Sequence, residues 1–345
     1  MKYDYTVFIG RFQPFHAGHM KVVERALEES ENLIMVLGNH DSPRTPRNPF
    51  TTDERIKIIR SALNVDQIGR VHFAPVENCL YNDEKWISQI QKAVHSIVFS
   101  VKWSSGPTKI ALIGHSKDHS SYYLNLFPTW DSINVEQHSY LDASDWRKET
   151  FEREDLVGWP QVHESEYMIN TDHKWQIQSI IDQPELEKIA LETVALKKYK
   201  EQYGSGPFLT TDSVVTQSGY VLLIQRKFDQ GEGLWAMPGG FLDTKETLLD
   251  GALRELDEET SIKVPIKVLR GSIETRKVYD NPHRSERARI VTTAYHFRLK
   301  DGPLPKVKAA DDAADARWFT ISEFLTMRSK MYDDHYDIIR DLIGV

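Results

Sequence analysis

The sequence contains only one cysteine, Cys79, among its 345 residues. A single cysteine excludes an intramolecular disulfide and any zinc site that needs several cysteines, and we expect Cys79 to be a small buried apolar residue. Long apolar runs are missing too, because no stretch reaches the roughly 18 consecutive apolar residues of a membrane span. The N-terminal residues have the pattern of a strand and lack the apolar stretch of a signal peptide. We therefore predict a cytoplasmic protein that has no membrane partner.

A surplus of positive charge is also missing. Lysine and arginine number 43 against 51 aspartate and glutamate residues, which gives a formal net charge of −8 at pH 7. Proteins that bind a nucleic-acid backbone usually carry a basic surface, so we expect no nucleic-acid partner. A small phosphate ligand is not excluded, since a few well-placed basic groups are enough to bind it. The length corresponds to roughly two domains at about 150 residues each.

Short apolar segments alternate with amphipathic stretches over the first 150 residues. This alternation predicts parallel strands joined by right-handed crossovers, which form an open α/β sheet. Ligands of such a sheet bind beyond the carboxyl ends of the strands, so we expect functional residues in the loops that follow them. The expected strands are Tyr5–Ile9, Leu33–Leu37, Val71–Ala74 and Ile110–Ile113, and the expected helices are Val22–Glu29, Glu54–Leu63 and Trp86–Val98.

The pattern changes around Pro184–Tyr203, a stretch of strong helix formers that a Gly-Ser-Gly-Pro breaker follows. We predict that this helix joins two domains, with residues 1–183 in the first, a linker over 184–206, and residues 207–345 in the second. Strands of the second half lie in hairpins and do not alternate with helices, which predicts an α+β domain. The expected elements are a hairpin of Ser213–Thr216 and Tyr220–Gln225, helices at Leu248–Glu259 and Ile321–Ser329, and strands at Ile290–Leu299 and Trp318–Phe319.

A loop rich in glycine and histidine, from Gly10 to His19, follows the first expected strand. Gly10 is expected to let the backbone turn sharply, and Gly18 to leave room for a phosphate at the N-terminus of the next helix. That helix end presents unpaired N–H groups with a partial positive charge, to which His16 and His19 add two hydrogen-bond donors. Two such histidines are also able to bind a metal, but no third ligand of matching type stands nearby. A pair of surface histidines is the remaining alternative.

The segment His16–His19 resembles the H-x-G-H signature of the nucleotidyltransferase superfamily. The run Gly-Arg-Phe-Gln-Pro-Phe-His narrows the resemblance to the archaeal type of nicotinamide mononucleotide (NMN) adenylyltransferase. Ser144 and Arg147 match residues of that family's last motif, from which Asp145 and Trp146 depart. Agreement extends to Arg47–Thr51 with Glu54–Ile56, to Trp86 and to Gly114–Asp118.

This resemblance implies an enzyme that converts NMN and ATP into NAD and pyrophosphate. The nucleophile is a phosphate oxygen that is already ionised at pH 7, so positioning and charge stabilisation supply the catalysis. It also implies that His16, His19 and Arg147 hold the ATP phosphates, together with Mg²⁺. Without the resemblance, Trp86 would be interpreted as a packed helix aromatic. The implied ATP and NMN site further comprises Gly10, Arg11, Gly18, Arg47, Trp86, Gly114, Lys117, Asp118 and Ser144.

Three carboxylates share one face of the helix expected at Leu248–Glu259. Glu255 and Glu259 are four residues apart, and Glu258 lies beside them. Like charges at this spacing repel one another by roughly 0.2–0.5 kcal/mol per pair, so the face is either simply solvated or suited to a cation. Oxygen ligands of this kind suit Mg²⁺ or Mn²⁺.

The same helix and the glycines before it resemble the Nudix box, G-x5-E-x7-R-E-U-x-E-E-x-G-U, in which U is aliphatic. Gly240, Glu246 and Arg254 have the required spacing. Ser261 is the single departure, because it stands where the box has the glycine that ends the helix. If the backbone there is left-handed, serine costs a little stability. Together, the two resemblances imply an open parallel Rossmann-like α/β nucleotidyltransferase domain and an α+β Nudix domain of the α/β/α sandwich type.

The second resemblance implies a pyrophosphohydrolase in which Mg²⁺ or Mn²⁺ activates water to attack a phosphorus of a nucleoside diphosphate derivative. Glu255, Glu258 and Glu259 would hold the metals, and Glu258 and Glu259 would be catalytic. The Gly239 carbonyl would be a further ligand, and Arg254 would orient the carboxylates. The general base is expected in a later loop, where the candidates are Asp311, Asp312 and Asp315.

The substrate of the second half is predicted from Gly233–Gly240, which resembles the ADP-ribose-cleaving group of Nudix enzymes. Cleavage of ADP-ribose would yield AMP and ribose 5-phosphate. NADH, NAD and dinucleoside polyphosphates stay open as substrates, as does a non-catalytic NAD or ADP-ribose sensor. For the first half, pantetheine phosphate and FMN are alternative acceptors of the adenylyl group. We predict a bifunctional enzyme of NAD metabolism whose substrates are ATP, NMN and ADP-ribose, and whose oligomeric state is open.

Overall fold

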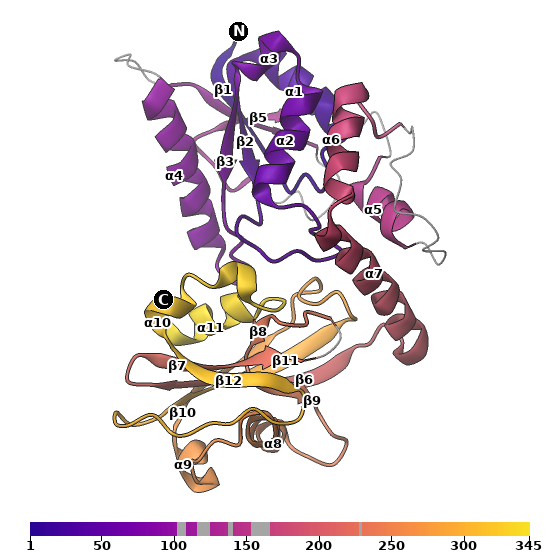
Figure 1. The fold of residues 1–345 in the computed structure, drawn as a ribbon. Helices are drawn as coiled ribbons and strands as arrows, with labels where there is room; N and C mark the ends of the chain where they lie inside the picture. The colour runs from indigo at the N-terminus through magenta and orange to yellow at the C-terminus, as the bar shows by residue number, and fades with distance from the viewer. Residues whose placement is uncertain (102–107, 116–124, 137–140, 153–165, 228–229) are drawn as a thin grey trace. The chain divides into compact units, whose positions relative to one another are not determined.

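The computed structural model describes residues 1–101, 108–115, 125–136, 141–152, 166–227 and 230–345. The chain forms two compact units, Met1–Val194 and Ala195–Val345 (Figure 1). The division falls within helix α7 (Pro184–Tyr203), and the helix predicted over these residues is confirmed. The predicted domain limits, with a linker over 184–206, stay a prediction.

The first unit is built on a five-stranded parallel sheet in the order β3-β2-β1-β4-β5. Strands β1 to β4 confirm the predicted strands, and with them the predicted open α/β fold. Strand β5 gives no sequence signal, because it is short, polar and mostly exposed. The strands are β1 (Tyr3–Gly10), β2 (Ser30–Leu37), β3 (Val71–Pro75), β4 (Ile110–Gly114) and β5 (Asp131–Asn134).

Alternate residues of the central strands fill two cores, one on each face of this sheet. Along β2, Leu33, Met35 and Leu37 belong to one core, while Ile34 and Val36 belong to the other. Burial on both faces explains why these strands are continuous apolar runs. Residues of α1, α2 and α6 complete the first core, and residues of α4 complete the second. The helices are α1 (Ala17–Glu29), α2 (Thr52–Ala62), α3 (Val65–Ile68), α4 (Asp83–Val101), α5 (Ala143–Phe151) and α6 (Thr171–Ile181).

The second unit is built on a mixed sheet in the order β10-β11-β6-β7-β12. Strands β6 and β7 form the predicted hairpin but pair only near its turn, where Thr216 faces Val221. Beyond that point β9 pairs with β6 and β8 pairs with β7, so β6 and β7 diverge around the two short strands. The strands are β6 (Phe208–Gln217), β7 (Tyr220–Arg226), β8 (Trp235–Ala236), β9 (Gly239–Phe241), β10 (Ile273–Tyr279), β11 (Ile290–Arg298) and β12 (Ala313–Thr320).

Helices cover both faces of this second sheet (Figure 1). Helix α8 packs Ala252, Leu253 and Leu256 against Val215 and Phe297 of the sheet, and α10 and α11 lie on the opposite face. This arrangement confirms the predicted α/β/α sandwich. The helices are α8 (Leu248–Thr260), α9 (Ile266–Gly271), α10 (Ile321–Phe324) and α11 (His335–Ile343).

The helix predicted over Ile321–Ser329 is wrong in length. Helix α10 ends at Phe324, and a separate 3₁₀ turn covers Arg328–Lys330. The Leu325 carbonyl accepts a hydrogen bond from the Tyr336 hydroxyl of α11, and the Thr326 hydroxyl donates to the Glu323 carbonyl. The Thr326 and Met327 N–H groups bond the carbonyls three residues before them, those of Glu323 and Phe324, so the chain tightens into a turn and α10 does not continue.

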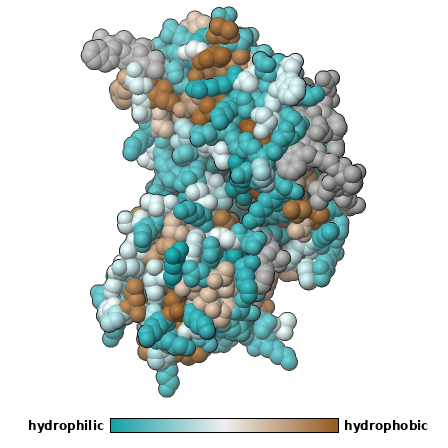
Figure 2. Space-filling view, viewed as in Figure 1, coloured by the Kyte–Doolittle hydropathy of each residue, from teal (hydrophilic) through white to brown (hydrophobic). Residues whose placement is uncertain are grey.

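The burial of Cys79 and the distribution of hydrophobic residues on the surface agree with what the composition predicts. Cys79 is buried, as predicted. Hydrophobic residues form small scattered areas among hydrophilic ones on the face drawn in Figure 2. Among the helices of the described ranges, none has the length and apolar character needed to cross a bilayer.

Candidate functional site

The loop after β1 is closed by its two histidines. His16 is the N-cap of α1, and its Nδ1 accepts a hydrogen bond from the Gly18 N–H at 3.1 Å. His19 reaches back, and its Nδ1 accepts from the His16 N–H at 3.3 Å. The ring centroids lie 3.8 Å apart. A neutral imidazole whose Nδ1 accepts carries its proton on Nε2, so each ring keeps one Nε2–H donor beside the N-terminus of α1.

The expectation for Gly10 is corrected by the structure. Gly10 has an ordinary backbone conformation, and the left-handed residue is Phe12, with a φ of 52°. A Cβ on Gly10 would lie 2.7 Å from the tip of the Phe12 ring. Glycine is therefore needed at this position because the Phe12 ring packs over its backbone, and the sharp turn occurs two residues later.

Helix α6 and the segment before it fasten the same loop. The buried His173 side chain shares a hydrogen bond with the Phe15 carbonyl at 3.1 Å, in which Nε2 is the donor. The Ala17 N–H donates to the Tyr167 carbonyl at 3.0 Å. Burial lowers the pKa of His173 to about 4, so this imidazole is neutral at pH 7. No sequence motif indicates the roles of Tyr167 and His173, because their hydrogen-bond partners are more than a hundred positions away in the sequence.

Helix α5 brings two predicted residues to this loop. Arg147 is buried, and its Nη1 donates to the Gln13 carbonyl at 2.6 Å. Its Nη2 donates to the Ser144 hydroxyl at 3.0 Å. The two departures from the family motif have other surroundings: Trp146 packs in the core, and Asp145 is exposed.

The loop between β2 and α2 carries Arg47. A tight turn from Thr45 to Asn48 holds this arginine, since the Asn48 N–H donates to the Thr45 carbonyl at 2.9 Å. The Gln13 side chain ties the loop to the one that follows β1. Its Nε2 donates to the Phe50 carbonyl at 2.8 Å, and its Oε1 accepts from the Phe50 N–H at 3.0 Å.

The remaining predicted residues of the first unit lie on separate elements of the fold. Arg11 directly follows β1, and Gly114 is the last residue of β4. Trp86 lies on α4, where its partly buried ring packs against the second core of the unit. This packing agrees with the interpretation of Trp86 as a packed helix aromatic, and its part in the ATP and NMN site stays a prediction. Lys117 and Asp118 lie outside the described residues.

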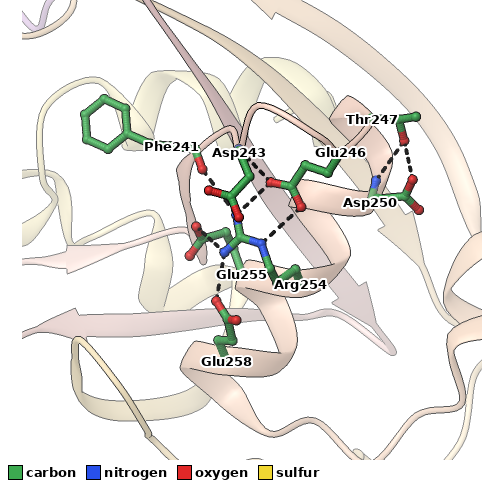
Figure 3. Close-up of polar contacts among 8 residues, drawn as sticks. All are labelled: Phe241, Asp243, Glu246, Thr247, Asp250, Arg254, Glu255 and Glu258. Carbon is green, nitrogen blue, oxygen red and sulfur yellow. Dashed lines mark hydrogen bonds and ion pairs between the residues drawn. The ribbon is translucent and has the colours of Figure 1, made fainter.

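In the second unit, Arg254 is the centre of a carboxylate cluster (Figure 3). Its guanidinium donates to both carboxylate oxygens of Glu246, at 2.8 and 3.1 Å. It also donates to Glu255 and Glu258, each at 2.8 Å. Helix α8 presents Arg254, Glu255 and Glu258, while Glu246 precedes the helix. The arginine thus fixes the side-chain positions of Glu246 and of two of the three box glutamates on α8.

Glu259 points away from this cluster. It is buried, and its Oε2 accepts from the Gly239 N–H at 2.9 Å. Burial raises the pKa of Glu259 to about 8, more than the Gly239 hydrogen bond lowers it. The glycines of β9 leave room for carboxylates, because a Cβ on Gly240 would lie 2.5 Å from the Glu255 Oε1.

Asp212 of β6 is a further carboxylate beside Gly239 that no box motif indicates. It is buried, and it accepts a hydrogen bond from the Thr292 hydroxyl. Burial raises its pKa to about 6. A Cβ on Gly239 would lie 2.3 Å from the Asp212 Oδ1, so the backbone of Gly239 lies close to two buried carboxylates. The only available signal is an acidic residue within an otherwise uncharged strand.

The three box glutamates do not converge on one point. Glu255 and Glu258 turn to Arg254, whereas Glu259 turns to Gly239, and within the described ranges no three His, Cys, Asp or Glu side chains are grouped as metal ligands. The donors nevertheless suit a divalent cation. They are carboxylate oxygens, which hard cations prefer, and a cation near Glu259 would favour its ionised form, which burial opposes.

The loop with the candidate bases lies at the end of the box helix. The Ala310 N–H donates to the Glu259 backbone carbonyl at 3.2 Å, so this loop lies beside the C-terminal end of α8. Asp311 and Asp312 are exposed there, and Asp311 has a φ of 51°. Asp315 lies on β12, where its Oδ2 is 3.5 Å from the Arg317 Nε. Asp311 and Asp312 directly follow Ala310 in the sequence, and all three aspartates stay candidates for the general base.

The helix end at Ser261 has the conformation expected for the glycine of the box. Ser261 is left-handed, with φ 42° and ψ 38°, and its N–H donates to the Asp257 carbonyl at 2.7 Å. The predicted left-handed cap is therefore confirmed.

Known proteins resemble the two units separately. Residues 7–117 match the cytidylyltransferase-like family, and residues 207–342 match the NUDIX domain. A nicotinamide/nicotinic acid mononucleotide adenylyltransferase of Acinetobacter baylyi is 42% identical over 135 residues, which cover 39% of this chain and 68% of that protein. An ADP-ribose pyrophosphatase of Methanocaldococcus jannaschii is 32% identical over 146 residues, which cover 42% of this chain and 78% of that protein.

The whole chain is also similar to a solved structure. That structure is a bifunctional NMN adenylyltransferase/ADP ribose pyrophosphatase from Francisella tularensis, complexed with AMP and a manganese ion. Its sequence is 31% identical, the similarity covers 99% of both chains, and the TM-score is 0.89. The two units of the present chain therefore occur together in a protein of known structure.

Proposed function

The chain belongs to the family of bifunctional NMN adenylyltransferases and ADP-ribose pyrophosphatases, and from this premise we propose that it catalyses both reactions. The first unit transfers the adenylyl group of ATP to NMN, which gives NAD and pyrophosphate. The second unit hydrolyses ADP-ribose to AMP and ribose 5-phosphate. The observation that carries the proposal is that one chain holds both the histidine loop capped on α1 and the glutamate helix that ends beside Gly239.

The first unit acts by positioning its two substrates. The Nε2–H groups of His16 and His19 and the N-terminus of α1 bind the ATP phosphates, and Arg147 adds positive charge from α5. NMN binds next to Arg47 and Trp86, and the loop after Gly114 binds the adenosine. The attacking phosphate of NMN is already ionised, so no residue has to remove a proton, and catalysis depends on alignment and charge.

The carboxylates of the second unit are suited to bind a divalent cation, and the hydrolysis depends on that cation. Glu255, Glu258 and Glu259, with the Gly239 carbonyl, would hold it, and the cation would supply charge for the diphosphate and activate water. Arg254 keeps Glu255 and Glu258 in place until the cation binds. Asp311, Asp312 and Asp315 are the candidates for the group that takes the proton of the attacking water. We propose Mg²⁺ as the working ion and Mn²⁺ as its substitute.

Chromatography of products from the purified chain tests both halves. With ATP, NMN and Mg²⁺ we expect NAD, and with ADP-ribose and Mg²⁺ we expect AMP and ribose 5-phosphate. A chelator should stop the hydrolysis, and replacing Mg²⁺ with Mn²⁺ identifies the preferred ion. A preparation that releases AMP but makes no NAD would contradict the first half of the proposal, and the reverse result would contradict the second.

Competition experiments define each substrate. Pantetheine phosphate and FMN, offered beside NMN, should not accept the adenylyl group, and NAD, offered beside ADP-ribose, should be cleaved more slowly. Rapid cleavage of NAD would contradict the pairing of the two activities, because the second unit would then destroy the product of the first. Since ATP and NMN are intracellular metabolites, the proposed location is the cytoplasm.

A further inference from the structure

Arg55 is a fully buried arginine for which the proposed reactions give no role. Its side chain is about 1% exposed, and it is among the largest side chains with so little exposure. Arg55 belongs to α2 and lies close to the N-terminus of that helix. Burying an arginine is unfavourable unless its donors find partners, so its hydrogen bonds indicate what the residue does.

The hydrogen bonds of Arg55 join two loops. Nη1 donates to the Arg11 carbonyl, which follows β1, and to the Gly38 carbonyl, which follows β2, both at 2.7 Å. Nη2 donates to the Asn39 carbonyl at 3.3 Å and to the Thr52 hydroxyl at 3.0 Å. One guanidinium therefore connects the loop that carries His16 with the loop that carries Arg47.

The electrostatic environment of Arg55 is a second observation that concerns its role. Among the described residues, no carboxylate contributes to the environment of Arg55, and burial alone lowers its pKa to about 10. The guanidinium stays charged at pH 7, and its partners are carbonyl and hydroxyl oxygens. Arg44 nearby differs, because its charge is neutralised by both carboxylate oxygens of Glu54 at 2.7 Å. A fork of donors suits the connection of several carbonyls better than a single ammonium group does.

The Gln13 side chain makes a second connection between the same two loops, through both backbone groups of Phe50. Two connections at different points prevent the loops from rotating about either one. The loop with His16 is proposed to hold ATP and the loop with Arg47 to hold NMN. Their separation therefore determines the distance between the attacking phosphate and the α-phosphate.

We propose that Arg55 is a positioning residue for adenylyl transfer, which keeps the ATP loop and the NMN loop at the separation that the reaction needs. The inference rests on the proposed function of the first unit. Misplacement of reacting groups by about 1 Å costs about 10²-fold in rate. Loss of Arg55 should consequently lower kcat far more than it weakens the binding of either substrate alone.

The test compares Arg55→Met and Arg55→Lys in the full-length protein. We expect kcat for NAD synthesis to fall about 10²-fold in Arg55→Met, with the KM values of ATP and NMN changed less than about threefold. Arg55→Lys keeps the charge but cannot reach both loops with a planar fork, so kcat should remain low. Calorimetric titration with ATP counts the binding sites per chain, which corrects kcat for any unfolded protein.

Matched controls separate positioning from general damage. Arg60→Met makes the same change at an exposed position of the same helix and should keep wild-type kcat. Gln13→Leu breaks the second connection and provides an independent measurement if Arg55→Met does not fold; it too should lower kcat with little change in KM. Hydrolysis of ADP-ribose by the same samples should be unchanged.

Some results would overturn the inference. Wild-type kcat in Arg55→Lys would show that charge alone matters, and equal losses of kcat and substrate affinity would show a merely structural role. If Arg55→Met does not fold, an unchanged kcat in Gln13→Leu would overturn it as well. Failure of the proposed function looks different, because the wild-type protein itself would then form no NAD.

Discussion

Each unit buries one ionisable side chain at its proposed site, a base in the first and an acid in the second, and neither side chain forms an ion pair within the described residues. In the first, Arg55 donates to carbonyl and hydroxyl oxygens, and burial lowers its pKa to about 10. In the second, Glu259 accepts from one backbone N–H, and burial raises its pKa to about 8. Burial disfavours the charged form of both groups, so Arg55 stays charged at pH 7, whereas Glu259 is mostly protonated there.

The sign of each charge fits the ligand proposed for that unit. Phosphates are anions, and the first unit offers them imidazole N–H groups, arginines and a helix N-terminus. A divalent metal is a cation, and the second unit offers it carboxylates, one of which is buried. The comparison teaches that a buried ionisable group serves the two sites differently: Arg55 connects backbone carbonyls of two loops, whereas Glu259 is proposed to contact the cation itself. It also predicts that the two sites fail independently.

The largest expected effect is that of Glu259→Gln. Glutamine keeps the shape and the contact with the Gly239 N–H, but it cannot supply a negative charge to a cation. Hydrolysis of ADP-ribose should fall about 10³-fold, while NAD synthesis by the same protein stays within twofold of wild type. Both products are measured by chromatography of one preparation.

Asp257→Asn is the matched control for this substitution, because Asp257 is an exposed carboxylate on the same helix. It should leave both activities unchanged. Equal loss of NAD synthesis and hydrolysis in Glu259→Gln would contradict the independence of the two sites.

The corresponding substitution in the first unit is His19→Ala. Its expected effect is somewhat smaller, because His16, Arg147 and the helix N-terminus remain. NAD synthesis should fall about 10²-fold, and hydrolysis of ADP-ribose should not change. The exposed His95 on α4 provides the control variant His95→Ala. Unchanged NAD synthesis in His19→Ala would remove this histidine from the site.

The sequence predicts those parts of the molecule that local patterns encode. Continuous apolar runs identify β1 to β4 because both faces of that sheet are buried. The box predicts a left-handed residue at position 261, and Ser261 adopts that conformation although it is not glycine. The histidine loop is recognisable for a similar reason, since His16 and His19 cap their own helix.

The parts that the sequence does not predict depend on distant partners. His173 is bonded to Phe15, 158 positions away, and Arg55 acts on the carbonyls of Arg11 and Gly38, which any residue would provide. Just beyond the end of α10, the Leu325 carbonyl accepts a hydrogen bond from Tyr336 of α11, which no local pattern indicates. Such contacts leave no periodic or compositional signal, so they become visible only when the chain is folded.

A third prediction concerns the stability of the first unit in acid. His173 binds its proton with a pKa of about 4 in the folded chain, against an ordinary value of 6.5, because it is buried. Between these pH values the unfolded chain binds more protons, so stability is complete above pH 6.5 and decreases as the pH falls towards 4. This one residue should remove about 2 kcal/mol of stability between pH 7.5 and pH 5.

Urea unfolding of wild type and His173→Gln at both pH values measures this contribution. Glutamine can still donate to the Phe15 carbonyl but does not titrate, so the variant should lose about 2 kcal/mol less than wild type on acidification. Burial also lowers the pKa of His335 in the second unit, but that residue is the same in both proteins. Equal losses in the two proteins would contradict the assignment.

The smallest predicted effect is a gain in the second unit alone. Ser261 holds a φ of 42°, a conformation that costs about 1 kcal/mol for a residue with a Cβ and little for glycine. Ser261→Gly should therefore raise the unfolding temperature of the second unit by about 2–4 °C, while Ser261→Ala should not raise it. Calorimetry of the full chain measures both, and the activities should stay at wild-type values because Ser261 follows the last box glutamate by two positions. A glycine variant no more stable than the alanine variant would mean that the serine is unstrained, and the single departure from the box would then have no physical cost.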